Sequence, residues 1–99
     1  MQRGGYIYIM SNKTRSALYT GVTASLFWRV MQHKALEGSK FTTKYKCVDL
    51  VYFEGFTSIT EAIHREKQLK KWKRFYKDEL IRKLNPELKD LTDSVEDEV

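Results

Sequence analysis

The sequence predicts a small mixed α/β domain of the α+β class, and three observations lead to that prediction. Residues 6–10 and 17–22 are rich in β-branched and aromatic side chains and flank a polar turn, which predicts a β-hairpin. Residues 47–54 form an almost continuous apolar and aromatic run, typical of a strand covered on both faces, and we expect it at the sheet centre. Helical periodicity is found in residues 26–36 and 58–74. A chain of 99 residues can bury one core of this kind.

The predicted hairpin carries several tyrosines on one face. Side chains alternate along a strand, so matching faces of the two strands should share one set of residues. This set is Tyr6, Tyr8, Met10, Ala17, Tyr19 and Gly21. A glycine within a strand often marks a close approach to the backbone. We therefore expect the tyrosines to share a surface beside Gly21, with another group close to that glycine.

The first predicted helix covers residues 26–36 and follows an N-cap signal in residues 23–25. Its expected inward stripe is Leu26, Val30 and Leu36. Arg29 and His33 are four residues apart and therefore share a face, which we place toward this stripe. A surface pair is the alternative interpretation. The polar and basic residues 38–46 predict a loop with at most one helical turn.

The second predicted helix, residues 58–74, has a carboxylate within its apolar face. Ser58 and Glu61 have the spacing of a capping box at its start. Its apolar stripe is Ile59, Ala62, Ile63 and Leu69. Glu66 falls within this stripe, where a lone carboxylate is costly unless it binds a cation or accepts strong hydrogen bonds. An ion pair with Arg29 is the alternative.

The most basic stretch of the sequence begins directly after Glu66. Its charged residues are Lys67, Lys70, Lys71, Lys73, Arg74 and Lys77, with Trp72, Phe75 and Tyr76 interleaved. Basic residues interleaved with aromatic ones favour a nucleic-acid interface over a merely solvated helix face. The candidate nucleic-acid-binding residues are Lys44, Lys67, Lys70, Lys71, Lys73 and Arg74.

A shorter helix is expected over residues 77–84, and Asn85-Pro86 predicts its end. Its apolar positions are Tyr76, Leu80, Ile81 and Leu84. We expect a domain over residues 1–85 and an acidic tail over residues 86–99, disordered from roughly Leu91. The tail holds six acidic residues against one lysine, so the net charge of +5 leaves about +10 on the domain. Such a charge favours a polyanionic partner.

Other site classes find little support. The single cysteine, Cys47, excludes an internal disulfide or a multi-cysteine zinc site and agrees with a reducing compartment. His33 and His64 are too far apart in the sequence to suggest zinc. There is no glycine-rich phosphate loop or nucleophile motif, hence no expected small-molecule cofactor. No apolar run has membrane length and no signal-peptide core is present, so we expect a soluble cytoplasmic protein without a membrane partner.

Polar residues on faces assigned to the interior suggest a reaction. They are Tyr8, Tyr19, Arg29, His33 and Glu66. A carboxylate can hold Mg²⁺ or a similar hard cation with few protein ligands, and a guanidinium can stabilise charge on phosphate. A tyrosine or histidine can move the proton of an attacking water. Together these groups suffice for phosphodiester hydrolysis with one metal, although core tyrosines and surface ion pairs are the structural alternatives.

The sequence resembles the GIY-YIG endonuclease family, in particular its small single-domain bacterial members. The resemblance covers roughly residues 4–86. It rests on Tyr6-Ile7-Tyr8 and Tyr19-Thr20-Gly21 in place of the two signatures, followed by Arg29, His33 and Glu66. It implies a central three-stranded antiparallel sheet flanked by helices, and hydrolysis of DNA phosphodiester bonds with Mg²⁺ or Mn²⁺.

The resemblance also implies roles for the five polar residues. Tyr19 would be the general base or position the water, and Tyr8 would orient water or phosphate. Arg29 would stabilise the phosphorane, His33 would assist proton transfer or hold the phosphate, and Glu66 would bind the metal.

Two residues depart from the family pattern. Tyr6 stands where many members have glycine. Many members also have an asparagine after the glutamate helix, and Asn85 is the candidate for it in this sequence.

The leading hypothesis is therefore a metal-dependent endonuclease acting on branched or duplex DNA, with DNA repair or recombination as its setting. An alternative is a DNA- or RNA-binding module with the same fold and little or no cleavage. A third possibility is a protein-interaction domain that uses the acidic tail. The tail could also occupy the basic surface and compete with DNA.

Overall fold

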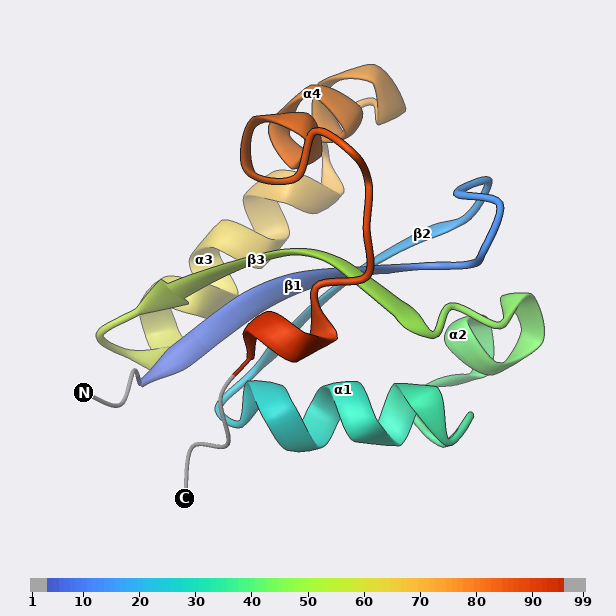
Figure 1. The fold of residues 1–99 in the computed structure, drawn as a ribbon. Coiled ribbons are helices and arrows are strands. Elements are labelled where there is room, and N and C mark those ends of the chain that lie inside the picture. Colours follow the sequence, from blue (N-terminus) through green and yellow to red (C-terminus); the bar gives the residue numbers. More distant parts are fainter. Residues whose placement is uncertain (1–3, 96–99) are drawn as a thin grey trace.

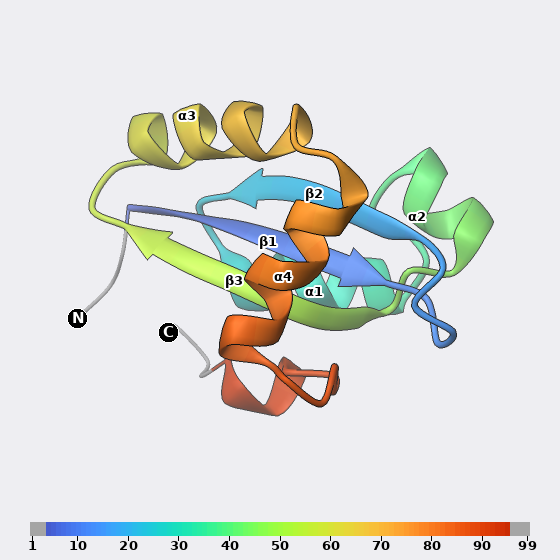
Figure 2. The same cartoon turned by 90° about the horizontal axis from the view of Figure 1, so that it is seen from above.

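The computed structural model describes residues 4–95 as a three-stranded sheet with helices on both faces (Figure 1). Its strands are β1 (Gly5–Ser11), β2 (Leu18–Thr23) and β3 (Asp49–Phe56). Its helices are α1 (Leu26–Lys34), α2 (Lys40–Tyr45), α3 (Ile59–Lys70), α4 (Arg74–Leu84) and a 3₁₀ turn, η1 (Thr92–Ser94). The α1 helix lies along one face of the sheet, and α3 and α4 lie on the other (Figures 1 and 2). The predicted α+β class and the antiparallel three-stranded sheet are confirmed.

The order of the strands differs from the expectation. The sheet order is β2-β1-β3, so β1 is central and the apolar run in β3 is at an edge. Leu50, Val51 and Tyr52 are nevertheless buried, because residues packed against both faces exclude water from them. An apolar run thus indicates that both faces of a strand are covered, and it does not indicate that both of its edges are paired.

A bulge interrupts β3 beside the C-terminal segment. Ile9 pairs with Tyr52 whereas Met10 pairs with Leu50, so Val51 is the extra residue of the bulged strand. The side-chain Nδ2 of Asn85 donates a 3.1 Å hydrogen bond to the Val51 carbonyl. Asn85 therefore satisfies a main-chain group of the bulge.

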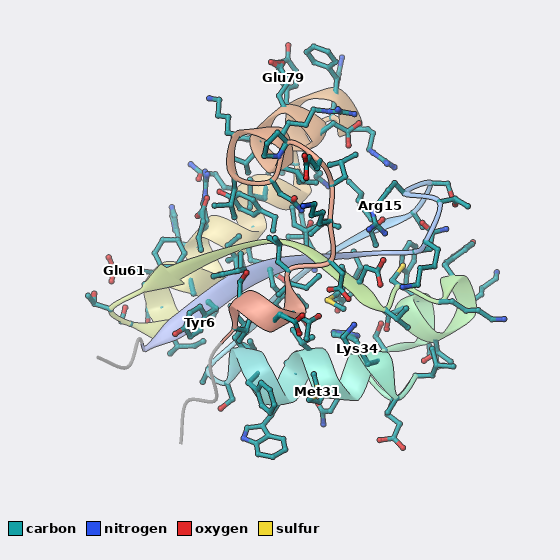
Figure 3. All side chains as sticks on the ribbon, viewed as in Figure 1. Tyr6, Arg15, Met31, Lys34, Glu61 and Glu79 are labelled. Atoms are coloured by element: carbon teal, nitrogen blue, oxygen red, sulfur yellow. The ribbon has the colours of Figure 1, made fainter. Side chains whose placement is uncertain are left out.

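The C-terminal segment then covers the outer edge of β3. The amide of Leu50 donates to the Asp90 carboxylate at 3.0 Å, and its carbonyl accepts from the Leu91 amide at 2.6 Å. Lys34 of α1 pairs with Asp90 at 2.8 Å, and Arg15 donates two hydrogen bonds to the Leu88 carbonyl; both cations are labelled in Figure 3. These contacts protect the edge strand and hold the segment on the domain.

The part of the tail that the structure describes, up to Val95, is ordered against the domain, in contrast to the disorder expected from roughly Leu91. Leu91 and Val95 pack against the core on the α1 side, and η1 follows directly after Leu91. The remaining tail residues, 96–99, lie outside the described residues. An acidic segment with few aromatic residues is typical of disorder. Composition alone does not show that a single carboxylate, such as that of Asp90, can accept a hydrogen bond from an exposed strand edge.

Two apolar clusters occupy the two faces of the sheet. Ile7 and Ile9 of β1 face α3 and α4, whereas Tyr8 and Met10 face α1. In the hairpin, Tyr8 pairs with Gly21 and Met10 with Tyr19, which confirms the predicted shared face. None of the helices in residues 4–95 is both long and apolar enough to cross a membrane.

The helices differ from their predicted bounds in several places. The α1 helix ends at Lys34, and Leu36, with a positive φ of 61°, is 40% exposed rather than inward. Residues 40–45 form a short helix where we expected a loop with at most one helical turn. Its start is capped by the Ser39 hydroxyl, which accepts from the Thr42 amide at 3.1 Å. A local cap therefore outweighed the polar composition.

The predicted long helix is divided in two. The α3 helix ends at Lys70, and α4 begins at Arg74 rather than near Lys77. Ser58 caps α3 as predicted and accepts from the Glu61 amide at 3.2 Å. Four expected inward residues are more than one-third exposed, because each helix turns only a narrow stripe to the sheet. They are Ile59, Ile63, Tyr76 and Leu84.

Candidate active site

The hairpin tyrosines meet over Gly21. Tyr8 is 1% exposed, and its ring lies so close to Gly21 that a Cβ there would be 2.4 Å from Tyr8 Cζ. The group that approaches this glycine is therefore the tyrosine of the neighbouring strand. The rings of Tyr8 and Tyr19 have centroids 6.4 Å apart. Glycine at position 21 allows the Tyr8 hydroxyl to extend past β2.

The α1 helix brings a histidine to this hydroxyl. His33 is 1% exposed, and its Nε2 lies 2.9 Å from Tyr8 Oη. Its other nitrogen, Nδ1, lies 3.0 Å from the Thr42 hydroxyl. Burial, together with the neighbouring Arg29 guanidinium, lowers the pKa of His33 to about 4. His33 is therefore neutral at neutral pH.

Four elements contribute charged or polar groups near Tyr8. Burial raises the pKa of Tyr8, as do the neighbouring Tyr19 hydroxyl and, more weakly, the Glu66 carboxylate. The Arg29 guanidinium opposes them and lowers the same pKa. These residues belong to β1, β2, α1 and α3, so the structure brings together groups that are far apart in the sequence.

Glu66 reaches this region from the other side of the sheet. It lies on α3, which runs beside the edge strand β2 (Figure 2). It is flanked on its helix by the buried Ala62 and Leu69, and its side chain is 14% exposed. Its carboxylate pairs with Lys70 at 2.9 Å. The ion pair with Arg29 considered from the sequence is not formed.

The donor set fits a hard divalent cation and does not fit zinc. Within residues 4–95 there is no group of three histidine, cysteine or acidic side chains around one point. Glu66 offers a single, largely buried carboxylate whose partner, Lys70, is half exposed and can turn away. Mg²⁺ and Mn²⁺ accept such sites because they keep several waters and bind substrate phosphate.

The candidate nucleic-acid-binding residues lie in two places. Lys44 is on α2, where its ammonium lies 5.3 Å from the centroid of the Tyr45 ring. The others are exposed at the junction of α3 and α4, and they are Lys67, Lys70, Lys71, Lys73 and Arg74. A hollow of about 500 Å³ at this junction is lined by Lys71, Trp72, Lys73 and Tyr76. This α3–α4 junction thus offers both positive charge and aromatic rings.

One cation of the junction, Arg74, has structural contacts as well, and its neighbour Lys77 lies among like charges. Arg74 donates to Asp78 at 3.0 Å and to the carbonyls of Arg15 and Ser16 in the β1–β2 turn. Burial lowers the pKa of Lys77, as do the nearby charges of Arg74 and Lys70. Positive charges are therefore crowded at the junction, a condition that an anionic partner would relieve.

Asn85, the sequence's candidate for the asparagine found in many family members, is used by the structure elsewhere, and two residues that contact His33 were missed. The side chain of Asn85 is 4% exposed, and its polar atoms bond the main chain of Val51 and Lys89. Thr42 and Gly38, by contrast, directly contact His33. The Ser39 cap, three residues before Thr42, was the available signal for an ordered helix start there.

Comparison with known proteins identifies the family of this chain. The model of the GIY-YIG catalytic domain family matches residues 4–79. A UPF0213 protein of Staphylococcus haemolyticus is 41% identical over 76 residues, which cover 77% of this chain and 92% of the relative. UPF0213 proteins of Clostridium perfringens and Natronomonas pharaonis are 43% and 38% identical over 76 residues, covering 77% of this chain and 81% and 88% of theirs. No solved structure is a significant match. The chain belongs to the GIY-YIG catalytic domain family.

Proposed function

We propose that this protein is a divalent-metal-dependent endonuclease that hydrolyses DNA phosphodiester bonds. The observation that carries the proposal is that Arg29 on α1 and the largely buried Glu66 on α3 both influence the pKa of the buried Tyr8 hydroxyl without pairing with each other. Among residues 4–95, Arg29 forms no ion pair, so its charge is available to a phosphate. Family membership supports a nuclease activity on nucleic acid.

In the proposed reaction a water attacks phosphorus in line with the leaving oxygen, and the bond between phosphorus and that oxygen breaks. Tyr19 removes the proton of the water or holds the water in place, and Tyr8 orients it through a hydrogen bond. Arg29 stabilises the charge that develops on the phosphorane oxygens, and neutral His33 supports Tyr8. Mg²⁺ or Mn²⁺ held by Glu66 would supply Lewis-acid stabilisation of a phosphate oxygen.

The proposed DNA path passes over two groups of exposed cations. Lys44 is on α2, and Lys67, Lys70, Lys71 and Lys73 are at the α3–α4 junction. Contacts with phosphates position the duplex without reading its sequence, so we propose branched or duplex DNA as the substrate class. DNA repair or recombination in the cytoplasm is the proposed setting.

A cleavage assay with Glu66→Gln tests the proposal. The wild type should nick supercoiled plasmid or cut a branched oligonucleotide with Mg²⁺ or Mn²⁺, and the variant should be inert because the neutral amide binds the metal poorly. The matched control is Glu79→Gln, an exposed carboxylate on α4 that lies at the opposite end of the molecule from Met31 of α1 (Figure 3). Equal activity of Glu66→Gln and wild type, or inert wild type on every DNA offered, would count against an endonuclease.

A nucleic-acid-binding module with little cleavage is the second candidate. The crowded cations and the aromatic hollow of the α3–α4 junction favour it, because these features serve binding without Glu66. It predicts salt-sensitive binding of DNA or RNA without divalent ions, weakened by joint replacement of Lys70, Lys71 and Lys73 with glutamine. Binding by an inert wild type would support this candidate and exclude the first.

A further inference from the structure

The segment between α1 and α2 forms a cradle for the His33 ring. A Cβ on Gly38 would lie 2.0 Å from His33 Nδ1, so position 38 accepts only glycine while the ring stays in place. Thr42, which is 1% exposed, lies against the same nitrogen. The ring is thus enclosed by Tyr8 on one side and by Gly38 and Thr42 on the other.

The hydrogen bonds of the buried Tyr8 hydroxyl decide which nitrogen of His33 carries the proton. Within residues 4–95, the acceptor within reach of the Tyr8 phenol proton is His33 Nε2, at 2.9 Å. A buried hydroxyl without an acceptor is costly, so the phenol donates to Nε2. Nε2 must then be unprotonated, and the proton of the neutral imidazole ring is on Nδ1.

The Nδ1 proton has an acceptor in Thr42. The Thr42 Oγ1 atom lies 3.0 Å from Nδ1 and can direct its own proton to the Ser39 carbonyl at 3.3 Å. Ser39 Oγ lies 2.9 Å from Thr42 Oγ1 and accepts a hydrogen bond from the Thr42 amide. The N-cap of α2 therefore also holds Thr42 against His33. The hydrogen bonds then run in one direction: Tyr8 donates to His33, His33 donates to Thr42, and Thr42 donates to the Ser39 carbonyl.

We propose that Thr42 is a positioning residue, which holds His33 in its Nδ1–H form so that the Tyr8 phenol proton points toward Nε2 and away from substrate. The lone pairs of Tyr8 Oη are then available to Arg29 and to an attacking water. Thr42 acts through His33 and touches no substrate. The link to water positioning rests on the proposed endonuclease function, whereas the tautomer does not.

Nitrogen NMR of the full chain labelled with ¹⁵N at histidine tests the tautomer directly. His33 should show a protonated Nδ1 and a bare Nε2, and the exposed His64 is the reference within the same spectrum. Thr42→Val, which keeps the shape and removes the acceptor, should shift His33 toward the Nε2–H form. Thr42→Ser should restore the wild-type spectrum, and Thr60→Val, which changes an exposed threonine on α3, should leave it unchanged.

Cleavage kinetics then separate positioning from folding. Thr42→Val should lower kcat by about tenfold to a hundredfold with little change in DNA affinity, and Thr42→Ser should restore it. A wild-type His33 protonated on Nε2, or a tautomer unmoved in folded Thr42→Val, would overturn the proposal. Should Thr42→Val fail to fold, the wild-type spectrum alone still decides. Absence of cleavage by wild type with the expected tautomer would refute the proposed function and leave the tautomer standing.

Discussion

Each face of the sheet buries one tyrosine beside an ionisable group, and the two surroundings are opposite in character. On the α1 side, Tyr8 bonds to the neutral His33. On the α3 side, Tyr52 donates a short hydrogen bond to Glu54, and burial raises the pKa of both tyrosines. Both clusters combine a buried tyrosine with an arginine and a carboxylate. They differ in whether the arginine and the carboxylate pair with each other.

The Tyr52 cluster is closed. Arg65 donates a hydrogen bond to each carboxylate oxygen of Glu54, at 3.0 and 3.1 Å. Its guanidinium also lies 5.4 Å from the centroid of the Trp72 ring. This two-pronged geometry is the strongest form of an arginine–carboxylate contact. Because Arg65 directly precedes Glu66, the closed cluster also fixes the rotation of the helix that carries the candidate metal ligand.

The Tyr8 cluster is open. Its arginine, Arg29, has no carboxylate partner among residues 4–95, and Glu66 has only the half-exposed Lys70. An arginine and a carboxylate kept apart in a partly buried region are costly for a free protein and useful to one that binds a phosphate and a cation. The closed cluster stabilises the fold, whereas the open one would leave Arg29 and Glu66 free to bind phosphate and metal in the proposed function.

The largest expected effect is on catalysis, from Arg29→Ala. The variant should lose roughly 10²- to 10³-fold in kcat, because the phosphorane loses a fixed positive charge. Its free energy of unfolding should change little, since no ion pair is broken. Steady-state cleavage and urea unfolding measure the two quantities. A variant that cleaves normally but unfolds more easily would show that Arg29 is structural like Arg65.

Breaking the closed cluster should have the reverse outcome. Glu54→Ala leaves Arg65 and the Tyr52 hydroxyl without their acceptor, and it should lower the free energy of unfolding by ~2–3 kcal/mol. Activity per folded molecule should remain close to that of the wild type at a temperature well below the Tm. Urea unfolding with single-turnover cleavage tests this. Unchanged stability would contradict the closed-cluster interpretation.

Asn85 offers a smaller test of the same distinction. Asn85→Ala removes the donor to Val51 and the contacts with Lys89, and it should cost ~1–2 kcal/mol of stability. Because these atoms bond only main chain, kcat and DNA affinity should not change. A selective loss of affinity, measured by titration of labelled DNA, would place Asn85 in the role of the asparagine found in many family members.

The last prediction concerns the pH dependence contributed by His33, whose slope is at most ~1.4 kcal/mol per pH unit. Its folded pKa of about 4 lies below its ordinary value of 6.5, so the unfolded chain binds the proton more readily. Stability should fall as pH decreases from 6.5 toward 4. Asp90, whose hydrogen bonds outweigh burial and lower its pKa to about 2, loses its contribution only below the usual carboxylate range. A His33→Gln variant lacking the slope between pH 6.5 and 4 would confirm the assignment.

The inward position of these candidate site residues was predictable from the periodicity of their elements. Tyr8 and Tyr19 follow the two-residue alternation of the hairpin, and Glu66 breaks an apolar stripe. Their contacts were less accessible. Thr42 escaped notice because its segment has only six helical residues, and its importance comes from the packing of α2 against α1.

The sequence by itself determined the α+β class, the matched faces of the hairpin and the polar residues that point inward, because alternation and helical periodicity are local properties. Only the tertiary structure decided that β1 is central, that residues 85–91 cover the edge of β3, and that Glu54 rather than Glu66 takes an arginine. Such choices depend on contacts between residues far apart in the chain, which no local pattern records. Among the described residues, Glu66 is left with only the half-exposed Lys70 as its partner, and Arg29 with no ion pair.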